Sequence, residues 1–298
     1  MSDGAQVATV PIRDAATVML VRDGEGPPGE SRLEVFMLRR NLRSDFVGGA
    51  YVFPGGGVDD ADRHVDLEDL CEGRSDEECS RLLGLDPPSG GLAYWVAAVR
   101  ESFEEAGVLL AYDRHGALVD LRDPGGAARF AVHRQAVDSG ARRLIEVCAE
   151  EGLRLAVDGM HYFSHWITPE GPTRRYDTRF FVGHAPEWQQ PLHDDRETVA
   201  SAWVRPADAL ARHRAGEFDM IFPTIRSLEA IGRFECADEL MAAAAAIESV
   251  PAILPRIVAD GDGMRILLPG DLGYDDAGGI PQGTPMPGRP GGPTRREP

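Results

Sequence analysis

The chain has 298 residues and a formal net charge of −18, with 43% hydrophobic and 27% charged residues. These values are ordinary for a globular protein with one large domain or two modest ones. The negative charge opposes general attraction to nucleic acid or to anionic membranes. No apolar run is long enough to span a bilayer, and the N-terminus lacks a signal pattern, so we expect a cytoplasmic protein that binds neither.

Two residue types limit the chemistry further. All 31 basic residues are arginine, which rules out a Schiff base and the lysine of a phosphate-binding P-loop. The four cysteines include no C-x-x-C pair, so free thiols are expected rather than a zinc site or a disulfide framework.

The first half of the chain alternates short apolar runs with one long helical pattern. Strands are predicted at residues 15–23, 33–40, 50–54 and 107–112, with a polar, irregular segment at 62–92 and a weak helical patch at 75–85. A helix is predicted over 92–106, because Trp95, Val99 and Phe103 recur at a spacing of four and Gly107 suits a C-cap.

The second half predicts further strands and helices. One or two amphipathic helices are expected at 128–153, strands at 160–168, 176–185 and 198–205, helices at 206–218, 223–234 and 237–249, and a hairpin at 256–268. The Gly- and Pro-rich residues 275–298 predict disorder. We therefore expect an α+β domain over 1–250, a hairpin extension over 251–274 and a tail over 275–298.

The segment RESFEEAGV at 100–108 places three glutamates in one sector of a helix: Glu101, Glu104 and Glu105. Like charges one turn apart repel, so this arrangement needs a partner. Oxygen ligands of this kind suit Mg²⁺ or Mn²⁺, and a solvated charged face is the alternative. The upstream segment FPGGGVDDAD at 53–62 is, alone, no more than a strand-ending turn.

Together the two segments resemble the Nudix box, in which a glycine and an acid precede R-E-U-x-E-E-x-G-U, with U a large aliphatic residue. Gly56 and Asp62 match the glycine and the acid, and residues 100–108 match the second half. There are two departures in residue type, because Asp62 replaces a glutamate and Ser102 occupies an aliphatic position. Residues 63–99 stand where the family has a short connector, so a long insertion splits the box, and the excursion 63–92 is expected to shape substrate access without supplying metal ligands.

The resemblance implies a Nudix α/β/α sandwich with a mixed β-sheet, here with helical insertions. It also implies a metal-dependent hydrolase that needs no protein nucleophile. Glu104, Glu105 and the Gly56 carbonyl would ligate Mg²⁺ or Mn²⁺. Glu101 would be a further ligand or would orient the attacking water, and Arg100 would hold the carboxylates in register.

Residues 15–235 resemble, more specifically, the coenzyme A and acyl-CoA diphosphatase branch of this family, one subgroup of which also carries a long insertion inside the box. The resemblance rests on the lead-in FMLRRNLRSDFVGGAYVFPGG and on HWITPEGPTRRYDTRFFV at 165–182. It implies hydrolysis of coenzyme A or acyl-CoA to 3′,5′-ADP and 4′-phosphopantetheine or its acylated form. Alternatives are ADP-ribose, a dinucleotide or a damaged nucleotide as substrate, or a non-catalytic metabolite sensor.

An acidic protein binds an anionic substrate only through local cations. Two arginine clusters are candidates for a terminal phosphate, and the alternative is that each arginine offsets nearby acids: Arg39, Arg40 and Arg43, and Arg174, Arg175 and Arg179. Glu197 is the candidate for a further metal ligand, against a plain surface acid. Trp95, Trp166 and Trp203 suit adenine stacking or, more simply, core packing, and residues 128–153 suit either a lid or a homodimer face.

Overall fold

The structure is a computed structural model that describes residues 10–26, 31–42, 48–194, 196–260 and 263–277. The chain divides into two compact units. The larger consists of Ala15–Ser164 and Arg179–Val250, and the smaller of Met1–Asp14, His165–Thr178 and Pro251–Pro298. The predicted site residues of the Nudix-like box all belong to the larger unit.

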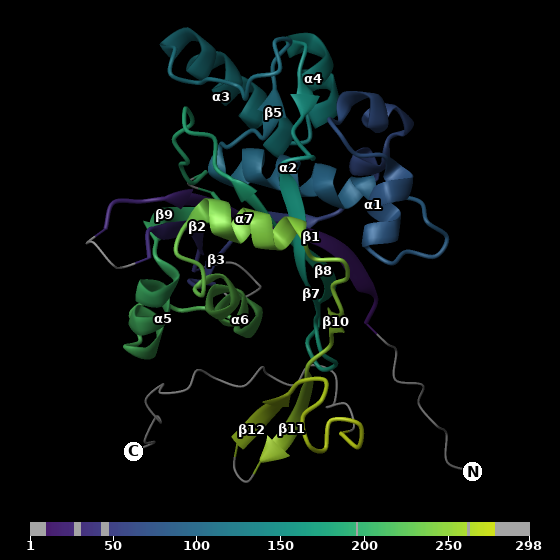
Figure 1. The fold of residues 1–298 in the computed structure, drawn as a ribbon, viewed down its shortest axis with the longest axis vertical. Coiled ribbons are helices and arrows are strands. Elements are labelled where there is room, and N and C mark those ends of the chain that lie inside the picture. Colours follow the sequence, from purple (N-terminus) through teal and green to yellow (C-terminus); the bar gives the residue numbers. More distant parts are fainter. Residues whose placement is uncertain (1–9, 27–30, 43–47, 195, 261–262, 278–298) are drawn as a thin grey trace. The chain divides into compact units, whose positions relative to one another are not determined.

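A β-sheet forms the centre of the larger unit (Figure 1). Its strand order is β7-β8-β1-β2-β3, while β4 pairs with β1 and β9 pairs with β2. The strands are β1 (Ile12–Asp23), β2 (Leu33–Arg40), β3 (Tyr51–Val52), β4 (Gly55–Gly57), β7 (Met160–Ile167), β8 (Arg175–His184) and β9 (Thr198–Val204). Strands β1 and β2 are buried on both faces over most of their length, which explains their nearly continuous apolar sequences.

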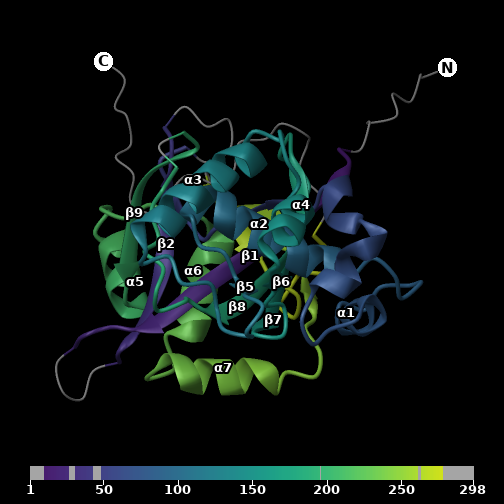
Figure 2. The ribbon, with the colours of Figure 1, turned by 90° about the horizontal axis from the view of Figure 1, so that it is seen from above.

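Helices cover both faces of this sheet, and Figure 2 shows α2 (Leu92–Ala106) and α7 (Ala237–Ala245) on opposite sides of it. Beyond α2, the chain forms α3 (Pro124–Asp138), α4 (Leu144–Glu151) and a short ribbon of β5 (Ala111–Tyr112) and β6 (Arg154–Leu155). After β9 the chain forms α5 (Pro206–Arg214) and α6 (Phe222–Ile231). The arrangement is an α+β sandwich with a mixed sheet, as predicted.

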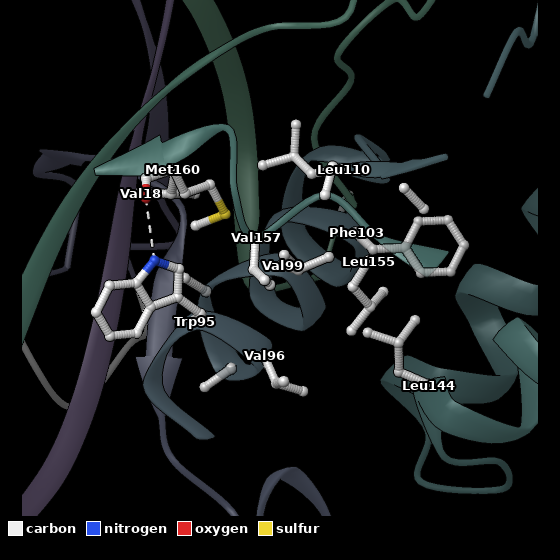
Figure 3. Packing of buried hydrophobic residues seen from close by; sticks show 14 of the residues in the cluster. Val18, Trp95, Val96, Val99, Phe103, Leu110, Leu144, Leu155, Val157 and Met160 are labelled. Carbon is white, nitrogen blue, oxygen red and sulfur yellow. Dashed lines mark hydrogen bonds between the residues drawn. The ribbon is translucent and has the colours of Figure 1, made fainter. Parts of the chain in front are cut away.

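Helix α2 is the centre of the hydrophobic core (Figure 3). Thirteen of its fifteen residues are buried, which a helix with a single apolar stripe would not show. The Trp95 side chain is fully buried, its indole N–H donates to the Met160 carbonyl at 3.1 Å, and its ring lies 4.5 Å from that of Phe181. Trp95 therefore packs in the core, and this burial fixes the position of α2 against the sheet.

The smaller unit contains the end of β7, the start of β8 and three short strands. Strand β10 (Ala252–Ile253) pairs in parallel with His165 and Trp166 of β7, which makes the sheet mixed. Strands β11 (Arg256–Asp260) and β12 (Gly263–Leu267) form the expected hairpin. Of the predicted tail, 278–298 lies outside the described residues, as does the predicted site residue Arg43.

Three expectations about local structure were wrong. The strand predicted at 107–112 shrinks to Ala111–Tyr112, because the backbone N–H and C=O of Leu109 bond to the side-chain amide of Gln189 instead of a strand. The segment 62–92 is less irregular than predicted, because it contains the end of one 3₁₀ helix, Asp60–Arg63, and the whole of another, Val65–Leu70. The helical patch predicted at 75–85 is present as α1 (Asp76–Leu82). Strands β6 and β10 were not predicted, since two-residue strands leave no alternating pattern. In the described residues, no helix has the length and apolarity needed to cross a membrane.

Candidate active site

Strand β4 crosses one face of α2 at two glycines whose lack of a side chain is required. A Cβ on Gly56 would lie 2.4 Å from a carboxylate oxygen of Glu101, and a Cβ on Gly55 would lie 2.4 Å from the Thr17 hydroxyl oxygen. The Gly55 N–H donates to the Glu105 carboxylate at 2.9 Å. The PGGG sequence therefore lets the backbone approach α2 closely enough to contact two of its glutamates.

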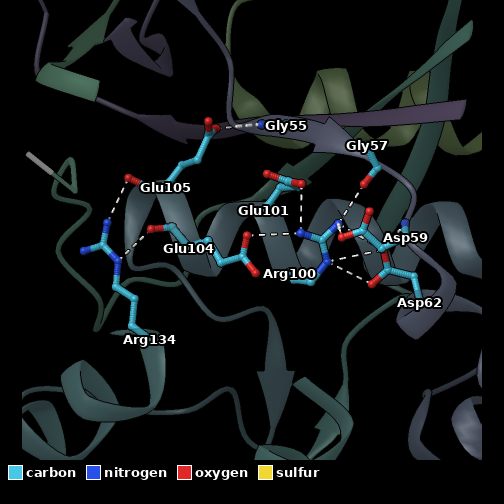
Figure 4. A network of polar contacts seen from close by, with 9 residues as sticks. All are labelled: Gly55, Gly57, Asp59, Asp62, Arg100, Glu101, Glu104, Glu105 and Arg134. Atoms are coloured by element: carbon cyan, nitrogen blue, oxygen red, sulfur yellow. Dashed lines mark hydrogen bonds and ion pairs between the residues drawn. The ribbon is translucent and has the colours of Figure 1, made fainter. Parts of the chain in front are cut away.

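Arg100 resolves the repulsion among the glutamates (Figure 4). Its Nη1 donates to Glu101 at 2.8 Å and to Glu104 at 3.1 Å. On its other side, Nε donates to Asp62 at 2.9 Å and Nη2 donates to the Gly57 carbonyl at 2.7 Å. Asp62 is buried. Through its bond to Arg100, the acid of the first half of the box contacts the arginine of the second half, although the insertion separates them in sequence. One guanidinium thus joins both halves.

The glutamates still carry more negative charge than this arginine balances. Burial raises the pKa of Glu101 to about 7, although Arg100 opposes the shift, and it raises the pKa of Glu104 to about 7 in the same way. Burial also raises the pKa of Glu105 well above its ordinary value, and the charge of Glu101 adds to the effect. Carboxylates in this state favour either a proton or a bound cation.

The donor set fits a hard divalent cation. The side chains of Glu101, Glu104 and Glu105 offer only oxygen, which suits Mg²⁺ or Mn²⁺ rather than a thiolate-preferring metal. Gly56 lies directly against Glu101, and its glycine identity leaves this approach open. These residues would hold the cation, and a cation there would compensate the charges whose burial raises the three pKa values.

A second group of residues with potential metal-ligand atoms lies elsewhere in the described structure. The ligand atoms of His133, Glu150 and Glu151 are within 4.8 Å of one another. Two arginines already neutralise these carboxylates. Arg129 bonds to Glu151 at 2.8 Å, and Arg142 bonds to Glu150 at 2.6 Å and to the His133 Nδ1 at 3.2 Å. This group is therefore a clasp between α3 and α4, and its charge balance leaves no demand for a cation.

Glu197 lies at the end of the β8–β9 loop, residues 185–197, of which 195 is not described. Its backbone is fixed on both sides, because its N–H donates to Asp194 at 3.2 Å and its carbonyl accepts from the Asn41 N–H at 2.8 Å. Its side chain is exposed, and its charge contributes to raising the pKa of Glu101 and Glu105, after burial as the main cause. The fold thus brings this distant acid near the box.

The arginines proposed for substrate binding occupy different surroundings. Burial is the main influence on the pKa of Glu105, but Arg40 is close enough to lower it. The Arg40 Nε is buried and has no hydrogen-bond partner among the described residues. Arg39 donates to the Gly49 carbonyl at 3.3 Å. Arg179 is buried, with its guanidinium 5.3 Å from the ring centre of Tyr94, while Arg174 and Arg175 belong to the smaller unit.

Comparison with known proteins identifies the family. The family model described as the NUDT19 Nudix domain matches residues 83–231. The chain belongs to the Nudix hydrolase family. A Nudix hydrolase from Alicyclobacillus acidocaldarius has a similar structure, with a TM-score of 0.64 and 25% identity over 82% of this chain and 100% of that one.

Two Nudix relatives cover most of the chain. Human acyl-coenzyme A diphosphatase NUDT19 is 29% identical over 282 residues, which is 83% of this chain and 74% of the relative. The protein of that name from Gallus gallus is 28% identical over 307 residues, or 89% of this chain and 80% of the relative.

The structure adds two residues at the ends of α2 that sequence reasoning missed. Asp76, inside the split Nudix box, accepts from the N–H groups of Gly90 and Leu92 at 2.8 and 2.9 Å, at the start of α2. Arg134 of α3 contacts the other end of the same helix. The signal available in the sequence was Gly91 at the N-cap of α2, a residue that has no capping side chain and so requires a partner from elsewhere.

Proposed function

We propose that this Nudix hydrolase is a divalent-metal-dependent diphosphatase that cleaves coenzyme A or acyl-CoA to 3′,5′-ADP and 4′-phosphopantetheine or its acylated form. The observation that carries the proposal is the arrangement of the site. Arg100 does not balance the negative charge of the buried carboxylates on α2, and Arg40 lies close to Glu105. The name of the relatives, acyl-coenzyme A diphosphatase, supports the substrate class.

The roles of the chain's residues follow from their surroundings. Glu104 and Glu105, with the Gly56 carbonyl and Glu197, would hold Mg²⁺ or Mn²⁺, which when bound neutralises the diphosphate and activates water. Glu101, which is held by Arg100 beside Glu104, would be a further ligand or would orient the attacking water.

Arg100 has a positioning role in this proposal. Arg100 keeps Glu101 and Glu104 at a fixed spacing through its bonds to both carboxylates. No covalent intermediate is required, because water attacks phosphorus directly and the phosphate of one product is the leaving group.

Substrate recognition by this acidic chain depends on few cations. Arg40 is our first candidate, because its charge reaches Glu105 and its buried Nε makes no hydrogen bond to the part of the chain that the structure describes. Arg39, Arg43, Arg174, Arg175 and Arg179 stay candidates for the 3′-phosphate. A homodimer through residues 128–153 and a cytoplasmic location also stay predictions, the first to be checked by light scattering.

A substrate panel with product identification by mass spectrometry tests the proposal. Coenzyme A and an acyl-CoA should yield 3′,5′-ADP with Mg²⁺ or Mn²⁺. Dephospho-coenzyme A should be poorer, because a lost charge-assisted contact of about 1.5–3 kcal/mol corresponds to roughly a ten- to hundredfold loss in kcat/KM. Equal use of both compounds would remove the argument for an arginine at the 3′-phosphate.

The alternative substrates belong in the same panel. Rapid hydrolysis of ADP-ribose, a dinucleotide or a damaged nucleotide, with none of coenzyme A, would replace the substrate proposed here. Divalent-metal binding without hydrolysis of any of these compounds would favour a metabolite sensor.

Arg40→Gln, compared with its neighbour Arg39→Gln, should raise the KM for coenzyme A more strongly if Arg40 contacts the substrate.

A further inference from the structure

The last four carbonyl groups of an α-helix have no partner within the helix, and in α2 each of the four has a partner outside it. The Phe103 carbonyl accepts from the Gly107 N–H at 3.0 Å, and the Ala106 carbonyl accepts from the Leu192 N–H at 2.9 Å. The carbonyls of Glu104 and Glu105 both accept from Arg134, at 2.9 Å each. A single side chain of α3 therefore caps the two residues that carry the proposed metal ligands.

The same guanidinium also contacts the β8–β9 loop. Arg134 Nη2 donates to the Leu192 carbonyl at 3.0 Å, while the Leu192 N–H bonds to Ala106 of α2. Gly107 makes room for this contact, since a Cβ there would lie 2.9 Å from Arg134 Nη1. Helix α3 also reaches the loop through an ion pair between Asp138 and Arg196, next to Glu197.

We propose that Arg134 is a positioning residue that joins the last turn of the Nudix helix to the β8–β9 loop and so fixes Glu197 relative to Glu104 and Glu105. The inference rests on the proposed metal site, and it adds a residue outside the Nudix box to that site's construction. Arg134 bonds to backbone carbonyls on both sides, so its effect passes through the placement of the carboxylates. Its planar fork, with several donors in fixed directions, suits this task better than a lysine does.

Direct titration of Mn²⁺ by calorimetry, without substrate, provides the main test. Residues that orient metal ligands typically contribute about 10–100-fold to metal affinity, so Arg134→Ala and Arg134→Gln should weaken Mn²⁺ binding by that order. Arg134→Lys should recover part of the loss, because it keeps a donor and a positive charge at the helix end. Arg129→Ala is the matched control, since Arg129 lies on the same helix but bonds to Glu151 of α4.

A double-mutant cycle with Glu197→Gln tests the connection to the loop. If Arg134 acts through Glu197, adding Arg134→Ala to Glu197→Gln should weaken Mn²⁺ binding much less than it does in the wild type. In kinetics, Arg134→Ala should lower kcat with little change in KM. The calorimetry and kinetics are carried out at a temperature at which circular dichroism and thermal unfolding show that every variant is folded.

The outcomes separate this inference from the proposed function. Unchanged Mn²⁺ affinity in folded Arg134→Ala would overturn the inference, even if the wild type hydrolyses coenzyme A. Full additivity with Glu197→Gln, or an equal loss in Arg129→Ala, would also overturn it. If the wild type binds Mn²⁺ but does not cleave coenzyme A, the proposed substrate fails while the titrations still decide the role of Arg134.

Discussion

At the scale of single residues, the site depends on how few cations face many carboxylates. Arg100 lies between Asp62 on one side and Glu101 and Glu104 on the other, so its charge is shared among several acids. Glu105 instead bonds to the backbone N–H of Gly55. A buried carboxylate whose hydrogen-bond donor is a neutral backbone group is the one whose charge should matter most to cation binding.

Replacement of Glu105 by glutamine removes one negative charge and keeps the shape of the side chain. We expect Mg²⁺ affinity and turnover to fall together, while the free energy of unfolding of the metal-free protein changes little or rises, because a buried charge is lost. Calorimetric titration, kinetics and urea unfolding check this, with Glu77→Gln on the surface as control. Turnover undiminished after chelation of the wild type would contradict the need for a metal.

The raised pKa values also predict a pH dependence. Burial raises the pKa of Glu101 and Glu104 from 4.5 to about 7, so between these pH values the folded protein holds more protons than the unfolded chain. The free energy of unfolding without metal should therefore fall as pH rises from about 4.5 to 7.

Mg²⁺ binds the ionised form of these carboxylates, so it should stabilise the fold increasingly over the same range. Urea unfolding at pH 5, 6, 7 and 8, with EDTA or with Mg²⁺, measures both effects. Stabilisation by Mg²⁺ that did not vary with pH would show that these carboxylates are not its ligands.

At the scale of elements, both ends of α2 are held by side chains from neighbouring helices, from α1 at its start and from α3 at its end. A Cβ on Gly91 would lie 2.3 Å from the backbone nitrogen of Ser80, so the N-cap position has no room for a capping side chain. Asp76 and Ser80 of α1 supply the acceptors instead. The Ser80 hydroxyl oxygen accepts from the Gly91 N–H at 2.8 Å, and the Asp76 carboxylate accepts from the Leu92 N–H. The long insertion in the Nudix box is therefore part of what begins the catalytic helix.

Asp76→Ala should lower the free energy of unfolding by about 1 kcal/mol, within the 0.5–2 kcal/mol typical of a lost N-cap. The neighbouring Glu77→Ala, which is exposed, should change it by less than about 0.5 kcal/mol. Urea unfolding of both variants checks the difference. Equal effects of the two substitutions would mean that the Asp76 contacts do not support α2.

The cap also refines the expectation about the insertion as a whole. If residues 63–92 shape substrate access without supplying metal ligands, as the sequence predicts, a short connector in their place should keep divalent-metal binding and alter substrate preference. Such a connector should keep metal binding only if it supplies an acceptor for the N–H groups at the start of α2, because otherwise they lose the Asp76 contacts.

At the scale of the whole molecule, Arg100 and the three glutamates of the proposed metal site all belong to the larger unit. In the described part of the chain, the buried cluster around α2 extends to Phe181, and the partly buried Val250 packs against it. Ile257 of the C-terminal segment pairs instead with Ile266 of its own hairpin. The negative net charge of −18 is spread over a chain that must bind an anion, so local arginines and a cation have to provide the attraction.

A chain truncated after Val250 should fold cooperatively and bind Mn²⁺ within about twofold of the full chain, because a compact unit with its own core is expected to be self-sufficient. Its melting temperature should fall slightly, since the two residues of β10 no longer pair with β7. Thermal unfolding and calorimetry of the two chains decide the matter. Loss of cooperative unfolding would show that the C-terminal segment is needed for the fold.

Much of the site could be predicted because its signals are local. The helical period alone places Glu101, Glu104 and Glu105 in one sector, and Gly107 ends the helix with a φ of 68° that favours glycine. The strand β2 was predicted with its observed bounds, because its apolar run is short and continuous. The contact between Arg100 and Asp62 was not predicted, since residues 63–99 separate them in sequence.

By itself, the sequence determined the fold class, the family and the carboxylate face of α2, since backbone geometry and the spacing of residue types carry that information along the chain. Tertiary structure alone decided which side chains satisfy the ends of α2, how deeply the glutamates are buried, and that Glu197 and Arg40 lie near them. Those features depend on packing between segments far apart in sequence. Burial and long-range hydrogen bonding leave no periodic trace in the residues that make them.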